Sequence, residues 1–193
     1  MKKLVLLAVA AAGISACSLG PRIIYGANRN LTFDTRQDVA AFYQKKNDFD
    51  TKELYFFENS ADYYAIVGDT TKTKSLPYYG IALGDDKMVA DPREKNTCVG
   101  VTARYMQAYD PASPTEANPF KGRVLRNVSG EPLTFSASEP TVVLFGHSNL
   151  GRGFKSDLNY YKETAATSGK KFRYVVVSLD IPKSDNPMWT NGK

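Results

Sequence analysis

The clearest hydrophobic pattern lies in the last third of the chain. Residues 141–146 (TVVLFG) and 172–181 (FRYVVVSLDI) are two nearly continuous apolar runs. Between them, apolar side chains recur at i, i+4, i+7 and i+11, which predicts one face of a helix. These side chains are Phe154, Leu158, Tyr161 and Ala165. Gly169 stands where such a helix ends. Because continuous apolar runs are typical of parallel strands buried on both faces, we predict a βαβ unit with a right-handed crossover.

The first half of the chain predicts a helix followed by short antiparallel strands. Asp34 and Gln37 are spaced like a capping pair, and an apolar stripe follows, so residues 35–46 are predicted to be helical. Aromatic and β-branched runs on either side of Asn59-Ser60 predict a hairpin. The stretch LPYYGIALGDDKMVA predicts another hairpin, turning at residues 84–86.

The middle of the chain is less regular. In TCVGVTARYMQAY, which fits strand or helix, the alternation of Val99, Val101 and Ala103 favours a strand for the first half. Residues 110–120 carry three prolines among small polar residues, which predicts a loop or linker. The stretch RVLRNVSGEPLTF predicts a short hairpin turning at Ser129-Gly130. The predicted fold class is therefore α+β (mixed α/β), with antiparallel hairpins before the βαβ unit.

The first residues, MKKLVLLAVAAAGISACSLG, predict a signal for export and lipidation. Lys2 and Lys3 precede an apolar run, residues 4–12, that is too short to span a bilayer. Ile14-Ser15-Ala16-Cys17 resembles the lipobox of bacterial lipoproteins. That resemblance implies cleavage before Cys17, acyl chains such as palmitate on Cys17, and anchoring in the membrane. Ser18, rather than Asp, favours the outer membrane. An ordinary secretory signal containing a Cys is the alternative.

Charge and cysteine content narrow the classes of function. Without residues 1–16, roughly 177 residues remain, enough for one domain or two very small ones. Their 23 basic and 20 acidic side chains give a net charge of about +3. No Lys/Arg block is present, so nucleic-acid binding is not predicted. With Cys17 acylated, Cys98 is the only thiol, which excludes an intramolecular disulfide and a Cys/His zinc cluster. We expect no metal and no cofactor.

The junction between the first strand and the helix of the βαβ unit resembles two kinds of active-site loop. Gly146-His147-Ser148 begins like the nucleophile elbow of α/β-hydrolases. However, Leu150 replaces the second glycine, and His147 is the only histidine in the chain. An elbow points neighbouring side chains apart, so His147 would not reach Ser148 to accept its proton. The sequence therefore predicts no hydrolase.

The P-loop comparison fails in a similar way. Gly146 and Gly151 have the P-loop spacing, but Arg152 and Gly153 replace the Lys and the Ser/Thr that this loop requires. Asp180 ends a strand that resembles Walker B, although too little chain follows for such a domain. No nucleotide hydrolysis is predicted.

Residues 123–181 resemble the segment of thioredoxin-like proteins that consists of a hairpin, a strand, the active-site loop, a helix and a strand. In that family the redox cysteines would fall near residues 150–153, where this chain reads Leu-Gly-Arg-Gly. Redox work requires a thiolate there, so the resemblance implies the fold without the activity. The two strands and the helix with a cis-Pro that the family places next are missing after residue 181. A truncated, permuted or unrelated sheet remains open.

Three further sets of residues are candidates for binding. The loop residues Ser148, Asn149, Gly151, Arg152 and Gly153 form a candidate anion-binding loop at a helix N-terminus. The alternative is that the glycines only permit the turn and Ser148 or Asn149 caps the helix. Cys98 is a reactive thiol or, more often for this residue type, a small buried hydrophobe. The tyrosine pairs 63–64, 78–79 and 160–161 offer aromatic faces, or place one ring in the core and one at the surface.

These observations predict a modular chain. Its segments are a signal peptide (1–16), a tether (17–32), an N-terminal α+β half (33–109), a Pro-rich loop (110–120), a thioredoxin-like βαβ half (121–183) and a tail (184–193). We expect an envelope lipoprotein with a binding, structural or assembly role, with the membrane and other envelope proteins as partners, and not an enzyme. The alternative is a thiol-dependent envelope redox protein that uses Cys98.

Overall fold

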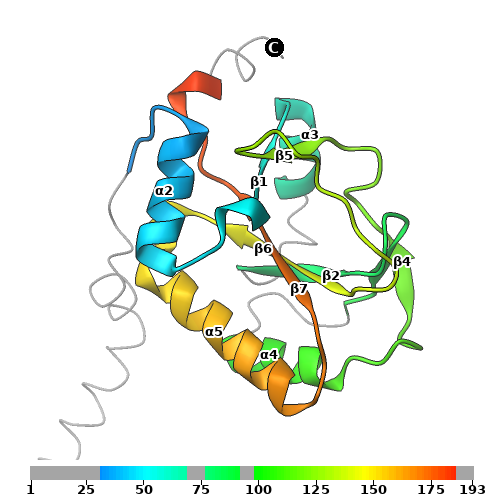
Figure 1. The fold of residues 1–193 in the computed structure, drawn as a ribbon. Helices are drawn as coiled ribbons and strands as arrows, with labels where there is room; N and C mark the ends of the chain where they lie inside the picture. The colour runs from blue at the N-terminus through cyan, green and yellow to red at the C-terminus, as the bar shows by residue number, and fades with distance from the viewer. Residues whose placement is uncertain (1–30, 69–76, 92–97, 186–193) are drawn as a thin grey trace, which may run out of the picture.

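A seven-stranded mixed sheet organises the part of the chain that the structure describes (Figure 1). The structure is a computed structural model and describes residues 31–68, 77–91 and 98–185. Across the sheet, the strands are β4 (Thr115–Ala117), β3 (Lys87–Val89), β2 (Tyr78–Ala82), β6 (Thr141–Gly146), β7 (Arg173–Ser178), β1 (Leu54–Phe57) and β5 (Leu125–Asn127). Four α-helices accompany them in these residues: α2 (Arg36–Asn47), α3 (Ser60–Val67), α4 (Val99–Ala108) and α5 (Arg152–Thr167). The predicted α+β class is confirmed.

The three strands β6, β7 and β1 run parallel. β6 pairs with β7 from Thr141 opposite Arg173 to Gly146 opposite Ser178, and β1 pairs with the other side of β7. Helix α5 joins β6 to β7, so the predicted βαβ unit is confirmed. The other neighbours are antiparallel: β2 lies beside β6, β3 and β4 follow β2, and β5 lies beside β1.

Both faces of the sheet are covered. On one face Val142, Leu144 and Val176 pack with side chains of α2, α4 and α5. On the other face Val143 and Phe145 pack with α3 and with residues from the long 118–135 segment. Figure 1 shows α2, α4 and α5 on one side and α3 with the β5 segment on the other. Every residue of β6 is therefore buried, as its continuous apolar run predicts.

The predicted hairpin across Asn59-Ser60 is wrong, because the residues after β1 form α3. The Asn59 side-chain oxygen accepts a hydrogen bond from the Asp62 N–H at 2.8 Å and caps the helix. Ile66 then packs in the core, with Tyr63 and Val67 partly buried beside it. A short aromatic run fits a strand and a helix equally well, and here the cap decides for the helix.

The strand predicted for the first half of TCVGVTARYMQAY is also wrong. This stretch forms α4, whose buried side chains are Thr102, Ala103 and Met106. Their spacing places them on one face of a helix. The alternation of apolar residues there is incidental, since Val101 is 44% exposed.

Helix α2 confirms the helix predicted at residues 35–46, but its capping residues differ by one position. Thr35, not Asp34, is the N-cap, and its side chain accepts a hydrogen bond from the Asp38 N–H. The Asp38 carboxylate in turn accepts from the Thr35 N–H at 2.9 Å. This reciprocal pair is a capping box. The predicted Asp34–Gln37 pair has the same spacing but does not cap the helix.

The remaining predictions concern turns. The hairpin turning at residues 84–86 is confirmed as β2 and β3. After the turn at Ser129-Gly130 the chain returns along β5 through a bridge between Arg126 and Pro132. Residues 110–120 are not entirely a loop, because β4 lies within them and pairs with β3. Trp189 and the rest of the predicted tail beyond Asp185 lie outside the described residues.

Strands from the two predicted halves share one sheet. β2, from residues 33–109, pairs with β6, and β1 from the same stretch pairs with β7. No helix in the described residues is long and apolar enough to cross a membrane.

Replacing Gly146 with Ala should destabilise this fold. A Cβ atom there would collide with the Tyr43 hydroxyl and come within 2.7 Å of Val176 Cγ1. Both neighbours are fully buried, so we expect the free energy of unfolding in urea to fall by about 1–3 kcal/mol. Gly100→Ala is the matched control, because a Cβ on that residue of α4 meets nothing within 4 Å. It should leave stability unchanged or raise it by up to about 1 kcal/mol. Equal losses in the two variants would contradict this account.

Candidate functional site

The carboxyl ends of the parallel strands bring several polar side chains to one edge of the sheet. Glu58 follows β1, His147 and Ser148 follow β6, and Asp180 follows β7 after one intervening residue. In open sheets with parallel strands this edge is where ligands usually bind. This edge is therefore the candidate functional site.

A buried contact between Asp180 and Ser148 dominates this edge. The Asp180 side chain is only 4% exposed. Its Oδ1 accepts a hydrogen bond from the Ser148 hydroxyl at 2.6 Å, and its Oδ2 accepts from the Ser148 N–H at 2.9 Å. Charge-assisted hydrogen bonds of this kind are short and strong. The Ser148 donors that were predicted to meet an external anion are therefore engaged by a carboxylate of the chain itself.

Two further groups complete the surroundings of Asp180. The Asp180 N–H donates to the Ser178 hydroxyl at 3.1 Å. The buried Tyr43 hydroxyl, from α2, donates to Asp180 Oδ2 at a long 3.5 Å. Burial first, and the Asp180 charge second, raise the pKa of Tyr43 well above its usual value. Tyr43 thus stays a neutral hydrogen-bond donor at physiological pH.

His147 lies beside this contact, with its imidazole directed to other partners. Its Nδ1 accepts a hydrogen bond from the Asn149 N–H at 3.0 Å and is 3.8 Å from Asp180 Oδ1. The predicted divergence of neighbouring side chains does not hold here, since His147 and Ser148 both approach Asp180. Even so, the Ser148 hydroxyl donates to a carboxylate and not to an imidazole, whereas a hydrolase triad requires a Ser–His contact.

The start of α5 differs from the predicted cap. Ser148 to Leu150 form a short 3₁₀ turn that precedes the helix, and Gly151 is the N-cap, so no side chain caps α5. Gly151 has φ 54° and ψ −135°, a backbone conformation that favours glycine. The alternative in which Ser148 or Asn149 caps the helix is therefore wrong.

The other residues of the candidate anion-binding loop differ in their exposure to solvent. Arg152 is exposed at the first position of α5, with Gly153 beside it partly buried. The Asn149 Oδ1 atom is buried and has no hydrogen-bond partner among the described residues. Anion binding by this loop stays a prediction, and it now depends on Arg152 and Gly153 because Ser148 is engaged.

Cys98 is exposed and forms the N-cap of α4 without a side-chain hydrogen bond to the helix. The expectation of a buried, hydrophobic Cys98 is therefore wrong. That expectation followed from residue statistics, whereas the chain reaches Cys98 just before the helix begins and its buried face starts only at Thr102. In the described part of the chain, no three Cys, His, Asp or Glu side chains gather as a metal site would require.

A second polar cluster at the same edge was not predicted from the sequence. Arg36, in α2, pairs with Asp185 at 2.7 Å and with Glu58 at 2.5 Å, and it also donates to the Phe57 carbonyl. Burial opposes the charge of Arg36, but the hydrogen bonds to Glu58 and Asp185 outweigh burial and raise its pKa. The cluster ties α2 and the C-terminal turn at Lys183–Asp185 to the end of β1.

Asp157, on α5, has a carboxyl whose pKa departs clearly from its usual value. Burial raises its pKa to about 6. Perturbed carboxyls often mark functional sites. Here burial is the only cause, and no second titratable group contributes, so Asp157 is not assigned to the site.

The three tyrosine pairs differ in how the two rings of each pair are buried. In the 160–161 pair, Tyr161 is buried and Tyr160 is 46% exposed, as predicted. Tyr64 is likewise 64% exposed beside a partly buried Tyr63. Tyr78 and Tyr79 are both buried because β2 lies within the sheet, so the prediction is wrong for this pair.

Replacing Asp180 should lower the free energy of unfolding more than replacing Ser148, and the two decreases should not be additive. Asp180→Ala leaves the Ser148 N–H and hydroxyl buried without an acceptor, so we expect a loss of about 2–4 kcal/mol in the free energy of unfolding. Ser148→Ala should cost about 1–2 kcal/mol. In the double variant the coupling between them should reach about 1 kcal/mol in a urea-unfolding cycle. Strict additivity would show that the contact contributes little.

Comparison with protein-family models, with curated proteins and with solved structures gives no match to this chain.

Proposed function

We propose that this chain is a lipid-anchored envelope protein with a non-catalytic binding, structural or assembly role. The observation that carries the proposal is the closed contact between Asp180 and Ser148. It engages the one serine of the candidate elbow, buries the hydroxyl and leaves His147 without a catalytic partner. A reactive serine would instead need an exposed hydroxyl and a base beside it.

The anchor itself is proposed from the sequence. The lipobox at residues 14–17 follows a positive start and a short apolar run. Acyl chains on Cys17 would hold the mature chain at a membrane, since each buried methylene contributes about 0.8 kcal/mol. We place the protein at the outer membrane on the basis of Ser18. Other envelope proteins are its proposed partners.

For the fold, we propose a permuted thioredoxin-like unit. β6, α5 and β7 supply the strand, helix and strand of that unit. The two antiparallel strands and the helix that the resemblance requires next have counterparts earlier in the chain: β2 pairs with β6, β3 pairs with β2, and α4 packs against α5. Pro77 directly precedes β2, and its carbonyl accepts the Phe145 N–H. The strand order and directions support this proposal, and the absence of Cys at residues 150–153 supports a role without redox chemistry.

Cys17→Ala should remove the lipid anchor and, with it, the proposed role at the membrane. In a Gram-negative host, the wild-type chain should incorporate labelled palmitate and sediment with the outer membrane. The Cys17→Ala variant should do neither, while Cys98→Ser should behave like the wild type. In-cell cross-linking should then recover the same envelope partners from the wild type and from Cys98→Ser. The proposal fails if the anchored wild type shows steady turnover of any substrate that is lost on replacing Ser148 or His147.

The exposure of Cys98 favours one alternative, a thiol-dependent role with a partner's cysteine. Because the thiol is accessible, it should react with a disulfide reagent in the folded chain within about tenfold of the rate in urea. A redox role further requires a mixed disulfide with an envelope protein. That species should be trapped with the wild type and absent with Cys98→Ser. Reactivity without any trapped partner would leave the non-catalytic role as the better account.

A further inference from the structure

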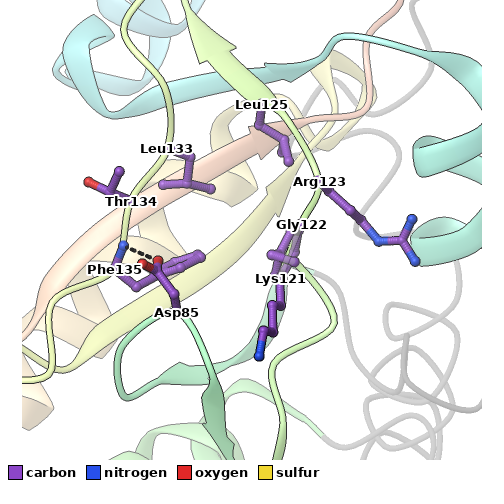
Figure 2. Close-up of a pocket in the computed structure, with 9 residues that line it drawn as sticks. Asp85, Lys121, Gly122, Arg123, Leu125, Leu133, Thr134 and Phe135 are labelled. Carbon is purple, nitrogen blue, oxygen red and sulfur yellow. Dashed lines mark hydrogen bonds between the residues drawn. The ribbon is translucent and has the colours of Figure 1, made fainter.

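A cavity of about 240 Å³ lies on the face of the sheet that α2, α4 and α5 do not cover. Its apolar wall is formed by Phe120, Leu125, Leu133 and Phe135. Figure 2 shows Leu125, Leu133 and Phe135 coming from two neighbouring stretches of the 118–135 segment, with Asp85 at the β2–β3 turn below them. The cavity is open to solvent on one side and smaller than the usual pocket for a drug-sized ligand, so it suits only a small molecule.

Backbone contacts fix the shape of this cavity in the absence of a ligand. The Leu133 N–H donates to the Leu125 carbonyl at 2.8 Å and joins the two stretches. The Phe135 N–H donates to Asp85 Oδ1 at 3.0 Å and joins the second stretch to the β2–β3 turn. Phe120, Leu125 and Phe135 are themselves buried. A wall held in this way needs little reorganisation when a ligand binds.

Two of the three charged side chains that line the cavity form ion pairs, and the third does not within the described part of the chain. The Lys121 ammonium pairs with Asp86 at 2.7 Å. The Arg123 guanidinium pairs with Asp62 at 2.5 Å, and Figure 2 shows it extending away from Leu133 and Phe135. Asp85 has no cationic partner among the described residues. Since Asp86 and Asp62 outside the lining already pair with the two cations, Asp85 carries the one charge of the lining without an ion-pair partner among the described residues.

We propose that this cavity binds a small organic amine, with an apolar body against Phe120, Leu125, Leu133 and Phe135 and an ammonium group beside Asp85. A closed apolar cavity of about 150 Å³ holds a benzene ring, so this one accepts a single ring with a short amine arm. The site goes beyond the proposed envelope role and does not depend on the lipid anchor.

Three probes of one shape test the assignment on the full chain in detergent, with protein-free detergent as the blank. They are para-fluorobenzylamine, para-fluorobenzyl alcohol and para-fluorobenzoate, followed by the broadening of their fluorine NMR signals. The amine should bind about fivefold more tightly than the alcohol, because an ion pair with the exposed Asp85 contributes up to about 1 kcal/mol. The benzoate should bind most weakly.

Two variants assign the effect to the cavity. Asp85→Asn retains an oxygen that can accept the Phe135 N–H but removes the charge, so amine affinity should fall to that of the alcohol. Glu139→Gln removes one exposed acid that lies four residues after Phe135 and outside the cavity lining, and it should leave all three affinities unchanged.

Several results would overturn the assignment. One is that no probe binds at concentrations up to about 10 mM, the weakest affinity expected for so small a ligand. Another is that the alcohol or the benzoate binds as tightly as the amine. A third is that Asp85→Asn leaves the affinity for the amine unchanged. The comparison of the three probes on the wild type stands even if a variant does not fold.

Discussion

The pair formed by β6 and β7 has to be covered by apolar side chains on both faces, and most of the fold follows from this constraint. Val142 and Leu144 point to one face while Val143 and Phe145 point to the other. One cover is made of helices, since α2, α4 and α5 each present a buried stripe. The other is made of α3 and a long irregular segment. A cover built from irregular chain packs less evenly than one built from helices, and the cavity beside Phe135 lies within it.

At the edge where the parallel strands end, a side chain of the protein itself occupies the position at which this topology usually binds a ligand. A strand followed by a glycine-containing turn and a helix leaves backbone N–H groups available to an anion. Here β7 delivers Asp180 to that position, and the carboxylate satisfies Ser148. A buried carboxylate needs such donors as much as they need an acceptor. In this protein the same local geometry joins the turn after β6 to the residues that follow β7.

The sequence predicted the elements whose pattern is long, and it failed where the pattern is short. The helix through Phe154 and Leu158 spans several turns, so its period is unambiguous, and the apolar strands on either side needed no tertiary information. The runs at Tyr63 and Val99 are too short for the period to decide between helix and strand. The contact between Ser148 and Asp180 joins residues 32 positions apart. It depends on the register of β6 against β7, which no local pattern encodes. The exposure of Cys98 likewise depends on where α4 begins.

The order of strands in the sheet has a consequence for how the protein is made. β6 and β7 lie at the centre of the sheet but near the end of the chain, whereas β1 and β2 flank them and come first. As the polypeptide emerges from the ribosome, β2 can pair with β3 and β1 with β5, but neither strand has its neighbour on the central side until β6 and β7 arrive. Contacts so distant in sequence form late. The two sides of the sheet can therefore be joined only after β6 and β7 have emerged, however early the pairs at its edges form.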